Sequence, residues 1–187
     1  MRLIKGVLLT WKWIYVHLFG WIFYDKKYLQ GRWFNDGIKS QGWIWASRDI
    51  HYRLHSLKHL HIRWPVAPEI ELGNNIFFHP DDLNNMNGFG NYFQTMDGKI
   101  VIGEGTYIAP NVGIITTNHD LNNPDEHLGG EDVLIGKQCW IGMNSVILPG
   151  VVLGDHTIVG AGSIVTKSFH EGNCVIAGNP ARKIKEL

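Results

Sequence analysis

Aliphatic residues recur at every sixth position through the last third of the chain. This spacing fits neither the 3.6-residue period of an α-helix nor the two-residue alternation of an ordinary strand. It is typical of a parallel β-helix, in which each face of a triangular coil takes six residues. The aliphatic side chains then point inward and stack from coil to coil. They are Ile135, Ile141, Ile147, Leu153, Val159 and Val165.

The fourth residue after each aliphatic position is mostly small, as a tight corner requires. Glycine often follows the aliphatic residue, and we interpret these glycines as turn positions with unusual φ. The small residues are Cys139, Ser145, Val151, Thr157 and Ser163, with the larger Phe169 closing the run. The glycines are Gly103, Gly136, Gly142, Gly154 and Gly160.

The same spacing runs earlier through Ile102, Ile108 and Ile114, with Thr106 and Val112 as small partners. Extrapolation upstream reaches Leu72 and Phe78, so we expect the β-helix to begin near Val66. The segment 84–91 breaks the aliphatic rule, and we expect corners or a loop there.

One interruption divides the repeat. Between Ile114 and Ile135 the phase slips by three residues, and the slipped segment contains His119. A loop that leaves a regular coil and carries a histidine is a candidate functional site.

Charge is divided unevenly between the two parts of the chain. Residues 1–64 hold 11 Lys and Arg against three Asp and Glu, and residues 65–187 hold six against 14. Seven of the eight tryptophans also lie in residues 1–64. We therefore predict a basic, aromatic, partly helical extension over 1–64. A β-helix domain over 65–187 follows, with a loop at 118–132 and a tail at 170–187.

The segment 7–24 is apolar and aromatic, with Lys12 and His17 inside it. A helix here would separate its basic side chains from its aliphatic ones, and its tryptophans would suit a lipid headgroup region. Three readings stay open: peripheral membrane contact through residues 1–30, packing on the β-helix or a neighbouring subunit, and a membrane span, which the central lysine disfavours. No nucleic-acid motif accompanies the basic segment, so no nucleic-acid partner is expected.

The two cysteines exclude a disulfide scaffold, and Cys139 falls on an inward position. We expect a cytoplasmic protein, at the inner face of the cytoplasmic membrane if the N-terminal segment binds lipid. His55, His59 and His61 have a spacing that could hold a metal, but no nearby cysteine or carboxylate completes a site. We interpret them as part of a basic face and expect no metal.

The run from IGKQCWIG to IVTKSF, followed by AGNPARKI, resembles the hexapeptide-repeat acyltransferases. It is most similar to the branch with galactoside and maltose acetyltransferases and the O-acetyltransferases of bacterial surface polysaccharides. The motifs cover roughly residues 97–185 and follow the order of the family. The resemblance implies a left-handed β-helix, a homotrimer with sites between subunits, and acetyl-CoA as donor.

In that family a loop after an IAPNV-like segment holds the catalytic histidine, which the resemblance places at His119 in TTNHD. Its imidazole would take the proton of a sugar hydroxyl as the hydroxyl attacks the thioester. We expect a carboxylate, from Asp97, Asp120, Asp125 or Glu126, to orient the ring. Asp97 aligns with an acceptor-binding aspartate of the family. The asparagine that accompanies it is Phe89 here, which leaves Asn91 as a neighbouring acceptor candidate.

The resemblance also implies a donor site. Trp140 matches an aromatic residue of the cleft, and Met143 a position that touches the pantetheine arm. Ala161, Thr166 and Lys167 match positions along the CoA channel. Arg182 and Lys185 match cationic positions at the CoA phosphates, where lysine replaces an arginine at the second.

The sequence therefore predicts an acetyl-CoA-dependent O-acetyltransferase acting on a sugar hydroxyl in bacterial surface polysaccharide synthesis, with an acceptor that can be lipid-linked. One alternative is N-acetylation of an amino sugar. Another is a γ-type carbonic anhydrase, whose three histidines would converge between subunits, although Trp140 and the GNPAR tail favour CoA. A non-catalytic scaffold on the same fold is the third.

Overall fold

The computed structural model describes the backbone of residues 2–187 and the side chains of residues 6–187. The part of the predicted membrane-contact segment that falls on residues 1–5 therefore lies outside the described side chains. The chain divides into two compact units, Met1–Pro68 and Glu69–Leu187. Each unit is described by itself.

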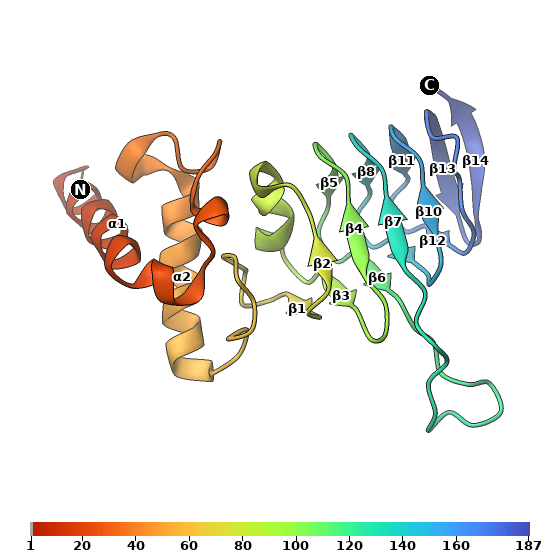
Figure 1. The fold of residues 1–187 in the computed structure, drawn as a ribbon. Coiled ribbons are helices and arrows are strands. Elements are labelled where there is room, and N and C mark those ends of the chain that lie inside the picture. The colour runs from red at the N-terminus through yellow and green to blue at the C-terminus, as the bar shows by residue number, and fades with distance from the viewer. Residues whose placement is uncertain (1) are drawn as a thin grey trace. The chain divides into compact units, whose positions relative to one another are not determined.

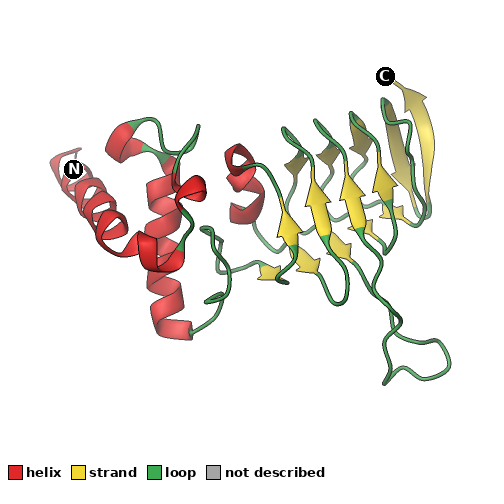
Figure 2. Cartoon of the chain, viewed as in Figure 1, coloured by secondary structure: helices red, strands yellow, loops and turns green. Residues whose placement is uncertain are grey.

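The N-terminal unit is helical (Figures 1 and 2). Two α-helices, connected by short 3-10 turns, account for most of its regular structure. Its elements are α1 (Arg2–Phe23), η1 (Lys26–Leu29), η2 (Gly37–Lys39) and α2 (Gln41–Ser56).

The side of α1 that packs is narrow. Val16, Gly20 and Tyr24, spaced four residues apart on one helix face, are buried. The aliphatic side that the sequence suggests for this helix is largely exposed, with Val7, Leu8 and Leu18 more than half accessible. The helix therefore keeps most of its apolar surface outside the core of its own unit.

A buried ion pair ties α2 to the segment that follows it. Arg53 and Asp49, one helical turn apart, are both fully buried, with Nη2 and Oδ2 2.8 Å apart. Arg53 also donates to the carbonyls of Ile62 (2.6 Å) and Trp64 (2.9 Å), and Tyr24 donates to Asp49. One guanidinium thus satisfies backbone oxygens that would otherwise be buried without partners.

The C-terminal unit is a left-handed parallel β-helix. Its strands form three sheets around one core, and successive strands along the chain pass from sheet to sheet. The first sheet (sheet A) contains β1 (Glu71–Leu72), β3 (Tyr92–Gln94), β6 (Gly113–Ile115), β9 (Val146–Ile147) and β12 (Ile164–Val165). The second (sheet B) contains β2 (Ile76–Phe77), β4 (Ile100–Ile102), β7 (Val133–Ile135) and β10 (Val152–Leu153). The third (sheet C) contains β5 (Tyr107–Ile108), β8 (Trp140–Ile141), β11 (Thr157–Val159), β13 (Cys174–Gly178) and β14 (Ala181–Glu186).

The six-residue repeat is confirmed as the core of this unit. Every aliphatic position from Ile102 to Val165 is buried, and the parallel register places Ile102 beside Ile135, and Ile114 beside Ile147. The small positions from Thr106 to Ser163 are buried as well, whereas Phe169 is half-buried. Stacked β-branched and aliphatic side chains therefore fill the interior from end to end.

The glycines after the aliphatic positions serve a purpose different from the one that we expected. None of the five has positive φ. At the corner between sheets B and C, a Cβ on Gly103 would lie 2.4 Å from the Gly136 carbonyl carbon, and one on Gly136 would lie 2.6 Å from Asp155 N. Glycine is required there because consecutive coils touch backbone to backbone.

Both ends of the β-helix depart from the repeat. At the start, a 3-10 segment, η3 (Pro80–Asn87), stands where the expected corners or loop begin and where a strand of sheet C would lie. Leu72 is half-buried and Phe78 is buried, so the repeat does extend upstream to β1. At the other end, β14 pairs antiparallel with β13 and closes the last coil.

Candidate functional site

The interruption of the repeat is a projecting loop. Residues 116–132 leave the coil at the corner between β6 and β7, which we call the A–B edge, and extend away from it (Figure 1). The loop folds back on itself as a hairpin, because Leu128 N donates to Asn118 O and Asp120 N donates to Glu126 O. His119 and His127 face each other across this hairpin as an antiparallel bridge.

Side chains of the preceding coil fix the foot of the loop. Gln94 Oε1 accepts hydrogen bonds from the backbone N–H groups of Thr116 (3.0 Å) and Thr117 (3.2 Å). A Cβ on Gly130 would lie 2.4 Å from the carbonyl carbon of Asp97, so the two strands of the loop leave directly beside that corner. Both ends of the hairpin are therefore held against the preceding coil.

The ring nitrogens of His119 have different surroundings. Nδ1 lies 2.7 Å from the Pro124 carbonyl oxygen, within the same loop. Because a carbonyl can only accept, this contact requires the proton to be on Nδ1 in the neutral ring, which leaves the lone pair on Nε2. The His119 side chain is exposed at the surface of the loop. This tautomer is the one that a general base needs.

A backbone carbonyl thus takes the position for which we expected a carboxylate. Among those candidates, Asp120 caps the turn of the loop instead, since its Oδ1 accepts from the N–H groups of Asn122 and Asn123. The His119 ring also packs against His127, with centroids 4.3 Å apart. Sequence reasoning missed both Pro124 and the His127 contact. No sequence motif marks either contact, because both form only when the hairpin closes.

The two acceptor candidates lie in different surroundings. Asp97 is exposed at the foot of the loop, in a corner with φ of 54°. Asn91 is buried, where its Oδ1 accepts from Val112 N at 3.0 Å and holds two coils together. Its carboxamide therefore does not reach the surface on which Asp97 lies.

A hollow of about 500 Å³ lies along the first coils, beside the Asp97 corner. Its lining mixes polar and apolar side chains, and it includes Gln94, the residue that anchors the loop. The lining residues that carry polar or aromatic side chains are Glu71, Asn74, Asn75, Tyr92, Phe93, Gln94 and Thr95.

The donor candidates on sheet C form part of an outward ladder. Trp140 is 57% exposed and lies between Tyr107 on β5 and Ile158 on β11, to which it is paired in register. The ladder continues through Val175 to Lys185 on β14. Arg182 is exposed on the same strand as Lys185. An aromatic surface therefore ends at cationic side chains.

Met143 and Ala161 lie at the next corner, between sheets C and A, which we call the C–A edge. The two are on consecutive coils, because Gly162 N donates to Met143 O at 2.8 Å. A Cβ on Gly142 would lie 2.6 Å from Ala161 N, so the coils are in close contact here. Both side chains are exposed, and they extend the Trp140 surface around the corner.

Thr166 and Lys167 lie on the A–B edge, the edge from which the histidine loop projects. Both are exposed, and Lys167 Nζ lies 5.6 Å from the centroid of the Phe169 ring. One protomer thus groups the predicted residues in two places. Asp97, His119, Thr166 and Lys167 share the A–B edge, whereas Trp140, Met143, Ala161, Arg182 and Lys185 lie on sheet C and the C–A edge.

The remaining reactive side chains are placed as follows. Cys139 is buried, and burial raises the pKa of its thiol. His59 is buried, while His55 and His61 are at the surface. Within the described part of this single chain, no group of three or more His, Cys, Asp and Glu side chains could hold a metal ion.

Comparisons with known proteins agree with this fold and with the acyltransferase resemblance. Residues 132–167 match the family model described as bacterial transferase hexapeptide (six repeats). The galactoside O-acetyltransferase of Escherichia coli K12 is 40% identical over 107 residues, which are 54% of this chain and 52% of that enzyme. The same organism's "Putative colanic acid biosynthesis acetyltransferase WcaF" is 37% identical over 89 residues, 48% of each chain.

Among solved structures, a hexapeptide-repeat-containing acetyltransferase from Vibrio cholerae superposes with a TM-score of 0.52 at 25% identity. The match covers 65% of this chain and 69% of the Vibrio protein. This chain spans about half the length of the curated relatives that it matches. The resemblance to the hexapeptide-repeat acyltransferases and the predicted left-handed β-helix are thus confirmed.

Proposed function

We propose that this protein is an acetyl-CoA-dependent O-acetyltransferase that modifies a sugar hydroxyl of a bacterial surface polysaccharide or its precursor. The observation that carries the proposal is the hydrogen bond between His119 Nδ1 and the Pro124 carbonyl. It leaves the lone pair on Nε2, on an exposed side chain of the projecting hairpin. Relatives named galactoside O-acetyltransferase and colanic acid biosynthesis acetyltransferase support the reaction class and the kind of acceptor.

The reaction requires two proton transfers, one from the sugar hydroxyl to His119 and one from His119 to the departing thiolate. A sugar hydroxyl is a weak nucleophile at neutral pH, so Nε2 of His119 removes its proton as the oxygen attacks the thioester carbonyl carbon. The C–O bond forms, the C–S bond breaks, and the imidazolium returns the proton to the departing thiolate. The Pro124 carbonyl stabilises the protonated ring through the Nδ1–H group. No acyl-enzyme is needed.

The distribution of the candidate residues supports a site between two copies of the chain. The loop with His119 lies on one edge of the β-helix, and the Trp140, Met143 and Ala161 surface lies at another. A neighbouring subunit that places its C–A edge against this A–B edge would bring donor and base together. A cyclic trimer repeats this contact three times and closes.

The acceptor side of the proposal rests on Asp97 and the hollow of polar and apolar side chains beside it. Asp97 presents a carboxylate at the foot of the loop, where it can accept a hydrogen bond from a second sugar hydroxyl. Polar side chains beside an aromatic ring, such as Tyr92, are suited to pyranose rings, which have polar edges and apolar faces.

The test is direct acetylation. Purified protein is incubated with acetyl-CoA and a panel of neutral sugars, amino sugars and capsule or lipopolysaccharide fragments, and products are identified by mass spectrometry. We expect a mass gain of one acetyl group that hydroxylamine removes, because esters are cleaved and amides are not. A hydroxylamine-resistant product would instead establish N-acetylation. Absence of CoA release with every acceptor would contradict the proposal.

A further inference from the structure

One side of α1 exposes a continuous row of large apolar side chains. The row lies opposite the buried Val16, Gly20 and Tyr24, and at roughly 3.6 residues per turn it occupies about half of the helix circumference. Single exposed apolar residues are common on soluble proteins, but a contiguous patch marks a contact surface. Its members are Val7, Leu8, Trp11, Leu18, Phe19, Trp21 and Ile22, all between 43% and 72% exposed.

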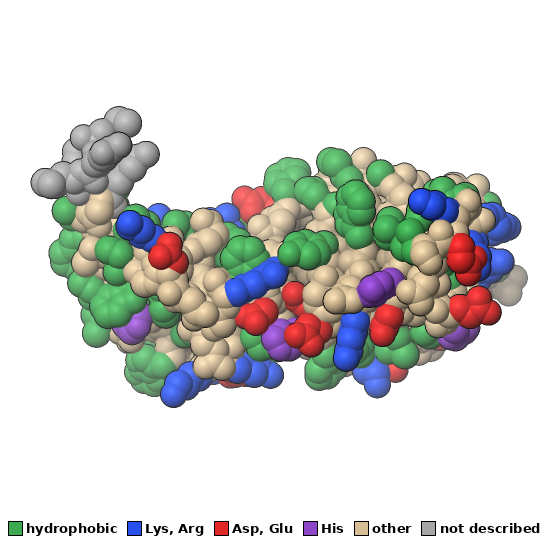
Figure 3. All heavy atoms as spheres, turned by 90° about the horizontal axis from the view of Figure 1, so that it is seen from above, with side chains coloured by type: hydrophobic (Ala, Val, Ile, Leu, Met, Phe, Trp, Pro, Cys, Tyr) green, Lys and Arg blue, Asp and Glu red, His purple; other side chains and the backbone are tan. Residues whose placement is uncertain are grey.

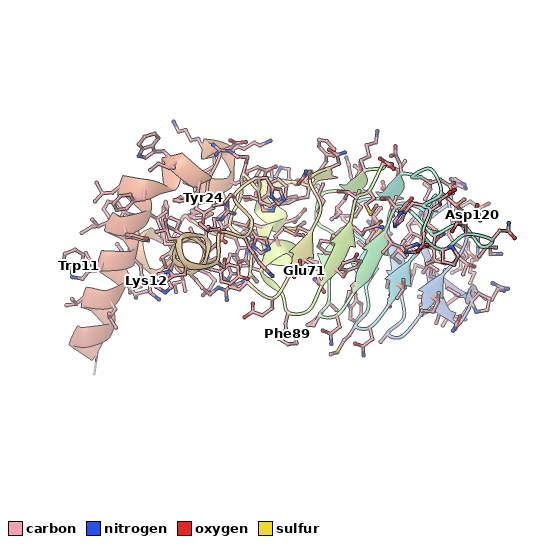
Figure 4. The ribbon with its side chains drawn as sticks, turned by 90° about the horizontal axis from the view of Figure 1, so that it is seen from below. Trp11, Lys12, Tyr24, Glu71, Phe89 and Asp120 are labelled. Carbon is pink, nitrogen blue, oxygen red and sulfur yellow. The ribbon has the colours of Figure 1, made fainter. Side chains whose placement is uncertain are left out.

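A groove of about 510 Å³ borders this row, between α1 and α2. Its apolar lining comes from α1, and its polar side comes mainly from α2. Figure 4 shows Trp11 pointing away from the helix pair, with Lys12 on the side of α1 that faces α2. The lining residues are Leu8, Trp11, Lys12, Tyr15, Ser47, Arg48 and His51.

The charged side chains that line this groove are all basic. Residues 1–24 contain no Asp or Glu, and the only carboxylate of α2, Asp49, is buried against Arg53. Lys12 and Arg48 therefore line the groove with no carboxylate among the residues of its lining. Figure 3 shows hydrophobic side chains gathered over the N-terminal helices, with both basic and acidic side chains beside them. An apolar surface bordered by cations fits an anionic lipid headgroup layer.

We propose that this face of the N-terminal unit docks onto an anionic phospholipid bilayer. The apolar row of α1 enters the boundary between headgroups and acyl chains, where Trp11 and Trp21 suit the interface. Lys12, Arg48 and His51 contact lipid phosphates from the groove. The inference does not depend on the proposed acetyl transfer, because it concerns only residues of the helical unit.

Two other occupants of this face are less compatible with its chemistry. In a second copy of the same face, Lys12 and Arg48 would approach cations of the same kind. A membrane span is open to α1 by length and composition, since the 18 residues Gly6–Phe23 have a mean hydropathy of 1.2 and only 11% of them are buried. However, a span would have to remove Val16, Gly20 and Tyr24 from their packing in the helical unit and place Lys12 in hydrocarbon.

The experiment is vesicle flotation of the full chain, without acetyl-CoA, on vesicles of phosphatidylcholine alone or mixed with phosphatidylglycerol. We expect binding to the mixed vesicles that weakens with salt, and weaker binding to phosphatidylcholine alone. The double variant Trp11→Ser, Leu18→Ser should lower binding about a hundredfold, because two large interfacial side chains are lost. Lys12→Gln should lower binding to the mixed vesicles roughly fivefold and leave binding to neutral vesicles unchanged.

Matched controls come from the same unit. Ile38→Ser with Leu60→Ser removes two exposed aliphatic side chains outside α1, and Lys39→Gln removes an exposed lysine outside the groove. Both should bind like the unchanged protein. The proposal is overturned if no vesicle binds, or if the controls reduce binding as much as the α1 variants do. It is equally overturned if Trp11→Ser, Leu18→Ser changes only the oligomeric mass, or if alkaline carbonate fails to release protein from membranes, which would indicate a span.

Discussion

His119 has two ring nitrogens, and its contact with the Pro124 carbonyl makes them unequal. The contact fixes which nitrogen holds the proton of the neutral ring, and the hairpin fixes where the other nitrogen points. In many enzymes a carboxylate has this orienting role, and a carbonyl can replace it because it only needs to accept. A neutral partner adds no charge to the loop, where Asp120, Asp125 and Glu126 are already close in sequence.

The buried thiol of Cys139 predicts how the free energy of unfolding changes with pH. Burial raises the pKa of its thiol, so the folded protein keeps this proton at a pH where the unfolded chain, with a thiol pKa of about 8.5, releases it. The stabilisation is complete below about pH 8 and is lost as the pH rises above 8.5. In denaturant titrations, the unchanged protein should therefore lose more free energy of unfolding between about pH 8 and 10 than Cys139→Ala does. Parallel pH profiles would contradict this.

Among the elements, the corners of the β-helix and the ion pair of α2 are the places where substitutions should destabilise the fold most. The stacked corners leave no room for a side chain at Gly136, since a Cβ would lie 2.6 Å from Asp155 N. Both charges of the α2 ion pair are buried, so water cannot solvate either of them if its partner is removed. In both places, the energetic cost of a substitution is decided by the neighbouring chain segments.

Gly136→Ala should destabilise the β-helix by roughly 1–3 kcal/mol, because the neighbouring coil must move. Gly129→Ala is the matched control in the loop, where no atom lies within 4 Å of the added Cβ. Thermal unfolding followed by circular dichroism measures both. Equal melting temperatures for the two variants would show that the corner contact is not limiting.

Arg53→Leu should destabilise the helical unit by about 3–5 kcal/mol, because Asp49 would stay buried without its cation. The carbonyls of Ile62 and Trp64 would lose their donor as well. Arg63→Leu provides the comparison, since its pair with Asp25 is about half exposed and should contribute at most about 1 kcal/mol. Chemical denaturation followed by tryptophan fluorescence reports on this unit, which holds seven of the eight tryptophans. Similar midpoints for the two variants would contradict the proposed difference.

For the whole molecule, the separation of the two residue groups predicts a shared site. His119→Ala removes the base, and Ala161→Asp places a carboxylate on the donor surface, so each variant alone should be inactive. When the two variants assemble together, some clefts combine the intact His119 loop of an Ala161→Asp chain with the intact donor surface of a His119→Ala chain. Random assembly should restore about a quarter of the activity of the unchanged trimer. If verified mixed assemblies have no activity, the site lies within one chain.

How far the sequence predicts this molecule differs between its parts. The repeat predicts the β-helix, its core and its one large loop, because each coil sees the same environment and the period survives in the residues. The sequence does not predict the contact of His119 with Pro124, since every residue has a backbone carbonyl and the residue type does not show which one accepts the hydrogen bond. It also does not predict which side of α1 packs, because an apolar helix offers several faces and only tertiary contacts select Val16 and Gly20.

Steady-state kinetics of His119→Ala, compared with His127→Ala, test the central claim most directly. The two histidines face each other in the same hairpin with ring centroids 4.3 Å apart, so both substitutions disturb the loop, but only the first removes the proposed base. With an acceptor from the panel, His119→Ala should lower kcat by about 10²–10⁴-fold with little change in the KM for acetyl-CoA. His127→Ala should retain activity within about tenfold. Equal losses in the two variants, or a fully active His119→Ala, would contradict the account.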